Sequence, residues 1–446
     1  GVKTFGTSSI MLGDTTTGTI DAANNNTGVG VDVFAALTSG DNNTAVGAGA
    51  LALNTTGTNN TAVGRSALLT NTTGSENVAL GANALDANTT GNYNIAIGKD
   101  ALAVQTAGTY NIAIGKNSSA AITTANSNVA VGYNSLSTNV AADRNTAIGM
   151  QCLQTMSSAT TADTNNTGVG FQAGLSMTTA SNNTCVGSKA LRDATTGSIN
   201  TAIGVSAMEN CTTGGQNVAV GRALWVGTLT GSNNVAVGLD AGKNVTSGDG
   251  NVTIGKDAGD DLTTGNRNVI IGLGCTGGTG GATHRIVMGY DAVGGTDDSF
   301  RFGRGSIDSQ IVFGATTITA PSDVRLKEDI QDEQIGLDFI NELRPVTFRW
   351  KKEKDIPSDM RVYKEGSDER VMNGTYNHGF IAQEVKQAID NYDFKEGFDL
   401  WTEEDHEDGR QRLGESALIS ILVKALQQAD DKIDALEARI TTLEGE

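Results

Sequence analysis

Proline, aromatic residues and long apolar runs are all scarce in this sequence. Its 446 residues include 3 prolines, and aromatic residues make up 5% of the chain. Because aromatic side chains supply much of a globular core, we expect small and β-branched residues to do most of the packing here. No apolar run reaches the roughly 18 residues that a membrane-spanning helix requires, so we expect no insertion into a membrane.

Paired cysteines and positive charge are lacking as well. The four cysteines, Cys152, Cys185, Cys211 and Cys275, form no Cys-x-x-Cys pair, so we expect buried free thiols and neither a metal nor a cofactor. The net charge of −19 argues against a nucleic-acid partner. Residues 322–446 hold 30 of the 50 acidic and 17 of the 31 basic residues, a net charge of −13. This segment therefore differs in composition from the rest of the chain.

A short phrase, Asn-x-small-(Val/Ile)-Gly, recurs through most of the chain. Its final glycine returns every 17 residues, except for one interval of 21 between Gly149 and Gly170. The glycines are Gly30, Gly47, Gly64, Gly81, Gly98, Gly115, Gly132, Gly149, Gly170, Gly187, Gly204, Gly221, Gly238, Gly255, Gly272 and Gly289. Fifteen of these 16 follow an Asn four residues upstream, and the last follows Arg285. A fixed period of this length predicts a stacked-repeat architecture.

Each repeat predicts one coil with a short strand and two glycine turns. Sixteen coils stacked about 4.8 Å apart would extend roughly 75 Å. We expect the Val/Ile before each glycine, and the residue two before it, to face the coil interior, and the small residue between them to face outward. An outward column such as Ala45, Ala62 and Ala79 would allow other chains to approach closely, which favours a trimer. We expect the Asn column to form hydrogen bonds along the stack.

The repeated phrase resembles the head repeats of trimeric autotransporter adhesins, and similar repeats occur in bacteriophage tail fibres. The resemblance implies a trimeric parallel β-roll, although the adhesin repeat is usually shorter than 17 residues. The corner at Met150-Gln151-Cys152-Leu153, together with Tyr110 and Trp225, is a candidate contact surface.

The chain is predicted to be mainly β, with four segments. These are an N-terminal segment (1–19), the repeat β-roll or β-helix (20–290), a β-neck (291–321) and an α+β module (322–446) that ends in a coiled coil (417–444). The coiled coil is predicted from apolar residues spaced alternately by three and four: Ile419, Leu422, Leu426, Ala429, Ile433, Leu436, Ile440 and Leu443. Their Ile/Leu layout alone favours two strands, whereas the repeats favour three.

Two phrases in the last module carry a second resemblance. Ser322-Asp323-Val324-Arg325-Leu326-Lys327 and Asn377-His378-Gly379-Phe380-Ile381-Ala382-Gln383-Glu384 resemble the C-terminal intramolecular chaperone and auto-processing domain of phage endosialidases, tail spikes and tail fibres. The resemblance implies that this domain assists trimer assembly and then cuts itself off.

The same resemblance implies the residues of the cleavage site. Ser322 would be the nucleophile and Lys327 its base, with cleavage beside Ser322, before Asp323. A Lys amine can serve as the base if burial lowers its pKa. His378 would either support the site or only pack. Without the resemblance, Ser322 and Asp323 would read as a helix N-cap.

Three functions remain open. The first is a trimeric phage tail fibre or spike, made in the host cytoplasm and carried on the virion, that binds a host-surface glycan or outer-membrane component and other tail proteins. Its only expected enzyme activity is a single-turnover self-cleavage. The second is a glycan-depolymerising spike, which needs paired carboxylates, whereas Asp100, Asp240 and Asp257 lie on separate repeats. The third is a bacterial trimeric adhesin, but we expect neither a signal peptide nor a membrane anchor.

Overall fold

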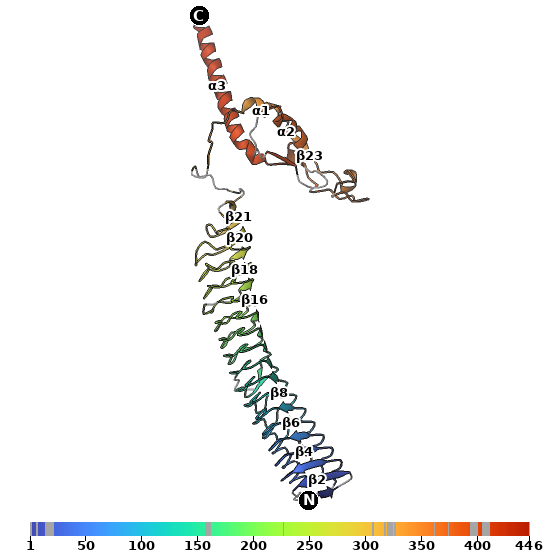
Figure 1. Cartoon of the computed structure of the whole chain (residues 1–446). Coiled ribbons are helices and arrows are strands. Elements are labelled where there is room, and N and C mark those ends of the chain that lie inside the picture. Colours follow the sequence, from blue (N-terminus) through green and yellow to red (C-terminus); the bar gives the residue numbers. More distant parts are fainter. Residues whose placement is uncertain are drawn as a thin grey trace. The chain divides into compact units, whose positions relative to one another are not determined.

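The computed structural model describes residues 2–5, 8–13, 22–156, 162–225, 227–305, 307–315, 318, 324, 327–360, 362–372, 374–392, 400–403 and 411–445. The chain divides into two compact units, Gly1–Pro321 and Ser322–Glu446. The first is a parallel β-solenoid and the second contains the long helices (Figure 1). The prediction of a mainly β chain built from stacked parallel coils is confirmed.

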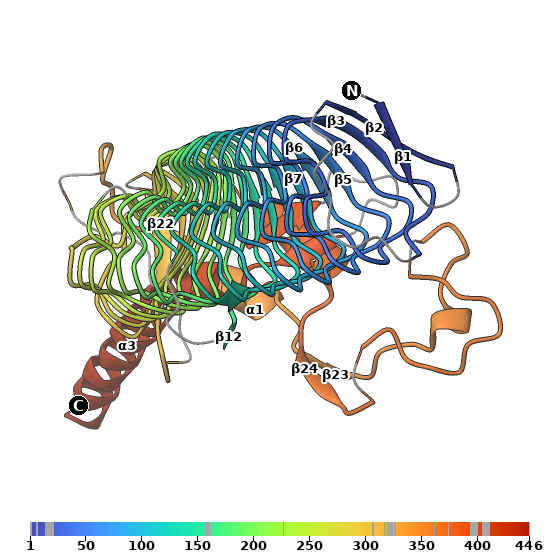
Figure 2. The same cartoon turned by 90° about the horizontal axis from the view of Figure 1, so that it is seen from below.

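The solenoid contributes one short strand per coil to a single sheet. Figure 2 shows the coils superimposed, with β3 to β7 along the same side. Neighbouring strands pair in parallel at the 17-residue offset, as Ala45 pairs with Ala62. The parallel strands are β2 (Ser9–Gly13), β3 (Thr27–Gly30), β4 (Thr44–Val46), β5 (Thr61–Val63), β6 (Val78–Leu80), β7 (Ile95–Ile97), β8 (Ile112–Ile114), β9 (Val129–Val131), β11 (Thr146–Ile148), β13 (Thr167–Val169), β14 (Thr184–Val186), β15 (Thr201–Ile203), β16 (Val218–Val220), β17 (Val235–Val237), β18 (Val252–Ile254), β19 (Val269–Ile271), β20 (Arg285–Tyr290) and β21 (Ser299–Arg304).

Both ends of the parallel sheet carry an antiparallel strand. β1 (Val2–Phe5) pairs with β2, and β22 (Ile307–Val312) pairs with β21. The glycine column also begins one coil earlier than the sequence count indicated, because Gly13 of β2 pairs with Gly30. The longer interval after Gly149 holds the short strand β12 (Ala162–Asp163), which pairs in parallel with β10 (Ala142–Asp143) of the preceding coil in a small side sheet.

Left-handed backbone conformations turn each coil. Gly47 has a φ of +127°, and a Cβ there would lie 2.6 Å from the carbonyl oxygen of Gly64 in the next coil. A side chain at this position would therefore both strain the backbone and separate the coils. Other residues also adopt positive φ, including Asn59 (58°), Ser66 (58°) and Leu68 (50°). The coil therefore has more corners than the two that the glycines predicted.

The two faces of the strands are opposite to the prediction. Ala79 of β6 is fully buried, whereas its neighbours Val78 and Leu80 are 37% and 47% exposed, and the other coils repeat this pattern. The coil interior is narrow, because the middle residue of each strand faces a corner pair such as Ala84 and Leu85, which fills the space. Only a small residue fits opposite such a pair. The Val/Ile columns therefore line the outer face of the sheet. Where glycine takes the second corner place, as at Gly259, the inner face holds the larger Thr253 and Ile270.

The predicted hydrogen-bonded Asn column is confirmed. The Asn77 Oδ1 atom accepts the backbone N–H of Asn94 at 3.0 Å, and its Nδ2 donates to the carbonyl of Gly91 at 2.8 Å. The pattern recurs from coil to coil, and the side chains are buried. At the last repeat Arg285 takes this place: its backbone N–H donates to Asn268, and its guanidinium contacts Gly277 and Asp297.

All four cysteines are buried free thiols, as predicted. Cys185 takes the place of the strand alanine, and Cys152 takes the place of the first corner residue. Gly168 lies against both: a Cβ there would stand 2.5 Å from the Cys152 Sγ and 3.4 Å from the Cys185 Sγ. A glycine in the strand thus compensates for a larger residue in the corner.

The described residues of the second unit form three α-helices and two small antiparallel sheets. The helices are α1 (Leu337–Glu342), α2 (Ala382–Ile389) and α3 (Leu418–Glu444), with the short 3-10 helices η2 (Glu353–Asp355) and η3 (Glu415–Ala417). The sheets pair β23 (Val346–Phe348) with β24 (Asn377–Gly379), and β25 (Trp401–Glu403) with β26 (Gln411–Leu413). A buried core joins the helices, formed by Phe339, Val385, Ala388, Leu400, Leu418 and Ile421.

Candidate processing site and assembly helix

The predicted cleavage residues lie at the start of the second unit. Ser322 and Asp323 are outside the described residues. Lys327 is exposed, and its backbone N–H donates to the carbonyl of Val324 at 3.1 Å. The burial that we expected around the Lys327 amine is therefore not found in the single chain.

His378, the second predicted residue, lies on β24. It pairs across the sheet with Thr347 of β23, whose Oγ1 lies 3.4 Å from the His378 Nδ1. The imidazole is exposed. The pairing of β23 with β24 accounts for the position of His378. A role of His378 in cleavage stays a prediction.

An ion pair joins the segment after α1 to helix α2. The Arg344 guanidinium, just after α1, makes two hydrogen bonds to the Glu384 carboxylate on α2, one of them 3.0 Å long. The hydrogen bond from Arg344 lowers the pKa of Glu384 below its usual value. Both groups are largely exposed, so this contact orients α2 more than it stabilises the fold.

Helix α3 has two apolar faces, one buried and one exposed in the single chain. One face carries Leu418, Ile421 and Ala425, which are buried in the core of the module. The other is the predicted heptad seam, and its large residues remain exposed in the single chain, from 43% at Leu422 to 71% at Leu426. The sequence predicted the seam but missed the first face, which is only three residues long.

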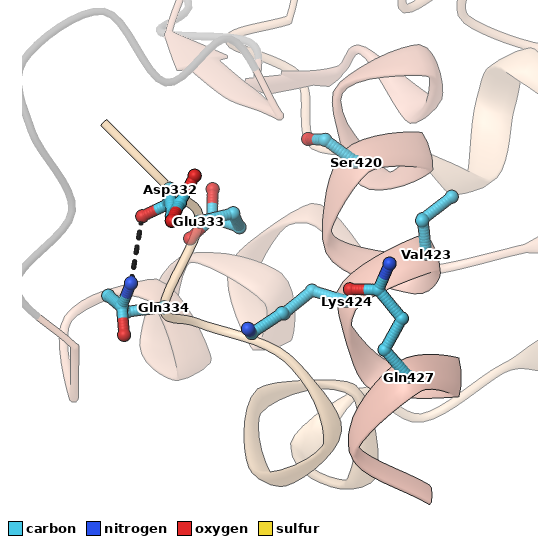
Figure 3. Close-up of a pocket in the computed structure, with 7 residues that line it drawn as sticks. All are labelled: Asp332, Glu333, Gln334, Ser420, Val423, Lys424 and Gln427. Atoms are coloured by element: carbon cyan, nitrogen blue, oxygen red, sulfur yellow. Dashed lines mark hydrogen bonds between the residues drawn. The ribbon is translucent and has the colours of Figure 1, made fainter. Parts of the chain in front are cut away.

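An open groove of about 530 Å³ runs beside this helix. It is lined by Asp332, Glu333 and Gln334 on one side and by Ser420, Val423, Lys424 and Gln427 of α3 on the other (Figure 3). The Gln334 side chain donates to the Asp332 carbonyl at 3.0 Å, and Lys424 extends towards these residues. The lining is mostly charged and polar, and it contains neither Lys327 nor His378.

A comparison with protein families gives a match within this module. Residues 322–394 match the family model described as chaperone of endosialidase. The search of the curated proteins found no match, and the search of the solved structures found none. The chain thus combines a β-solenoid with a C-terminal segment similar to the chaperone of endosialidase, a combination that suggests a tail fibre-like or spike-like protein.

The predicted contact surface on the solenoid is only partly accessible. Tyr110 is 59% exposed, whereas Trp225 is 1% exposed and Cys152 and Leu153 are fully buried. The last three were predicted wrongly, because they belong to corners whose side chains fill the coil interior. Within the described ranges, no cluster of His, Cys, Asp and Glu could hold a metal ion. None of the helices in the described part of the chain combines the length and apolar character that a bilayer crossing requires.

Proposed function

We propose that this protein is a trimeric phage tail fibre or spike that binds the surface of a host cell. Its C-terminal domain would align three chains, start their assembly and then cut itself off near Ser322. In this proposal the protein is made in the host cytoplasm and acts on the virion, where its other partners are tail proteins. The proposal rests above all on the chaperone-of-endosialidase match directly after a long solenoid.

The outer face of the sheet supports a trimer. One column of Val, Ile, Leu and Met side chains runs along it, with exposures such as 40% for Ile148 and 41% for Ile203, and the second column mixes Val and Ile with Thr, as at Thr44 and Thr201. A continuous apolar face of this kind is uncommon on a monomer. The alanine column faces the coil interior and cannot meet another chain, so the outward column of Val and Ile is the surface that would face the partner chains. The exposed seam of α3 is a second unpartnered apolar face.

Self-cleavage follows from the resemblance and has a coherent chemistry. The Lys327 amine would accept the proton of the Ser322 hydroxyl as Oγ attacks a backbone carbonyl. The peptide bond would break with the proton passing to the leaving amine, and water would then hydrolyse the resulting ester. The family match begins at residue 322, which agrees with this position for the nucleophile.

The mass of the purified chain under denaturing conditions tests the cleavage. We expect the wild type to give products divided near residue 322, and both Ser322→Ala and Lys327→Ala to remain at the full 45.9 kDa. A wild-type chain that is intact, like both variants, would remove the proposal of self-cleavage. Sedimentation of the Ser322→Ala chain tests the trimer separately, and a monomer there would refute it.

A further inference from the structure

The second half of helix α3 is exposed on all sides in the single chain. Every side chain from residue 430 to 444 is exposed, although the helix continues to Glu444. A helical segment of roughly four turns is only marginally stable on its own in water. The seam residues in this half, each between 52% and 65% exposed, are Ile433, Leu436, Ile440 and Leu443. The segment therefore requires a partner helix to bury its seam.

Charged residues flank this seam and are sorted by sign. In the heptad notation a to g, the seam holds positions a and d, and positions e and g lie on its two sides. The residues at position g are Lys432 and Arg439, and those at position e are Asp430, Glu437 and Glu444. From residue 430 onwards the chain has no other basic residue. One side of the seam is therefore basic and the other side is acidic.

The single helix does not explain this arrangement of charges. Ion pairs within a helix join residues three or four positions apart. None of the five flanking residues has a residue of opposite charge at that spacing. Glu444 also lies in the last turn, where a negative charge is unfavourable to the helix dipole. The charges therefore point to a contact outside the chain.

We propose that the α3 helices of neighbouring copies pack parallel and in register, joined by ion pairs between the basic side of one helix and the acidic side of the next. The pairs are Lys432 with Glu437 and Arg439 with Glu444. In parallel heptads a g residue lies beside the e residue five positions later on the neighbour, which matches both pairs. An antiparallel arrangement would set g beside g and e beside e, so like charges would repel. This inference rests on the proposed trimer and names how its chains are joined.

The first half of α3 also has two different sides. On the g side, Leu418 and Ala425 are buried in the core of their own module. On the e side, Val423 is 51% exposed and lines the open groove shown in Figure 3. Parallel packing brings the g side of one helix to the e side of the next, so the covered side of one copy faces the open side of its neighbour. Such head-to-tail contacts can close into a ring.

Assembly of charge-reversed chains tests the pairing. The full chain carrying Ser322→Ala is refolded from guanidinium at low salt, and light scattering gives the protein concentration for half-maximal trimer formation. Lys432→Glu/Arg439→Glu should raise this concentration at least about tenfold, because each attraction becomes a repulsion. Glu437→Lys/Glu444→Lys should do the same. The two variants change the net charge in opposite directions, so an effect of overall charge cannot weaken both.

The four substitutions combined in one chain provide the matched control. They exchange the basic and acidic sides of the seam, and the concentration for half-maximal assembly should return to within about threefold of the parent value. In about 1 M salt, where screening acts over roughly 3 Å, all the variants should assemble alike. Reversed chains that assemble like the parent, or a combined variant no better than the reversed ones, would overturn the inference.

An introduced cysteine tests the direction of the helices. The native thiols are buried, so a mild oxidant in the folded state should act on an exposed new thiol alone. Leu443→Cys lies in the seam near the end of α3, and parallel helices bring its copies together, so two chains should become joined by a disulfide. Ala438→Cys faces away from the seam and should remain unjoined. Trimers in which Leu443→Cys forms no disulfide would refute parallel packing.

Failure of this inference differs from failure of the proposed function. Trimers that form regardless of these charges would refute the ion pairs and leave the trimeric fibre standing. A Ser322→Ala chain that stays monomeric would refute the proposed trimer itself and leave the seam to a partner of another sequence.

Discussion

Single residues stabilise the solenoid through two devices, a buried polar column and a matching of side-chain sizes. A ladder asparagine such as Asn77 accepts the buried backbone N–H of the next ladder residue and donates to the carbonyl of a turn glycine, which Asn88 also contacts. The side chains of the strand residue and of the corner residues meet inside a narrow coil. A larger side chain at one of these positions therefore requires a smaller one at the other. Both devices are local, and both can be tested with one or two substitutions.

Replacement of one ladder asparagine should be costly. Asn77→Ala leaves the buried N–H of Asn94 without its acceptor, whereas the carbonyl of Gly91 keeps the Asn88 Nδ2 as a donor at 3.1 Å. One buried unsatisfied group should cost about 1 to 3 kcal/mol in the free energy of unfolding. Denaturant titration measures it. Asn59→Gly is the control, because Asn59 is exposed and glycine accepts its φ of 58°. An equal loss in both variants would show that the ladder bonds contribute little.

The matching of sizes predicts a rescue. Gly168→Ala places a methyl group 2.5 Å from the Cys152 Sγ, and such overpacking costs about 1 to 3 kcal/mol. Cys152→Ala in the same chain restores the strand and corner residues of the other coils and should recover most of the loss. A double-mutant cycle on denaturation midpoints measures the coupling. Additive losses would contradict direct contact between the two positions.

The buried thiols predict a loss of stability in alkali. Burial raises the pKa of Cys152 and of Cys211 to about 12, from an ordinary value near 9. Below pH 9 the thiols are protonated in both states, so their contribution does not vary with pH. Between pH 9 and 12 only the unfolded chain releases the protons, so stability falls as pH rises, by about 1.4 kcal/mol per thiol at pH 10.

Denaturant titration at pH 8 and at pH 10 measures this loss in the free energy of unfolding. Cys152→Ala/Cys211→Asn, which restores the residues common at these positions, should show a smaller loss. A double variant as sensitive to alkali as the wild type would assign the effect to other groups.

At the level of elements, the sequence predicted where the strands and the last helix lie better than which way they face. Strand positions followed from the glycine period, and α3 followed from its heptads. The alternation of β6 is the same whichever face is buried, so the pattern alone could not orient it. The deciding fact is the width of the coil, which depends on corner residues such as Leu85 that contact the strand only after folding.

The two faces of α3 make a prediction about assembly. Leu426→Asp places a charge in the exposed seam and should dissociate the full-length Ser322→Ala chain, because a buried unpaired carboxylate is strongly unfavourable. Sedimentation equilibrium measures the mass. Ala438→Asp makes the same change on the opposite side of the helix and should leave the oligomer intact. Two variants with equal masses would mean that the seam does not hold the chains together.

At the scale of the whole molecule, the period that builds the solenoid also makes it ambiguous. Sixteen near-identical coils offer many registers between parallel chains, and each displaced register would pair similar Val/Ile columns. The correct register needs a reference point outside the repeats. A C-terminal domain that joins the chains through α3 before the coils form would supply it. Loss of that domain by cleavage would then leave the shaft kinetically trapped.

Refolding experiments test whether the C-terminal domain sets the register of the solenoid. We expect the full-length Ser322→Ala chain, unfolded in guanidinium and diluted, to recover soluble trimers at several-fold higher yield than residues 1–321 alone, because only the longer chain carries the reference point for the register. Yield is measured by size-exclusion chromatography with light scattering. Addition of separate 322–446 should not rescue the shorter chain, since the domain sets the register only through its covalent link to β22. Equal yields from both chains would mean that the solenoid finds its register from the Val/Ile face alone.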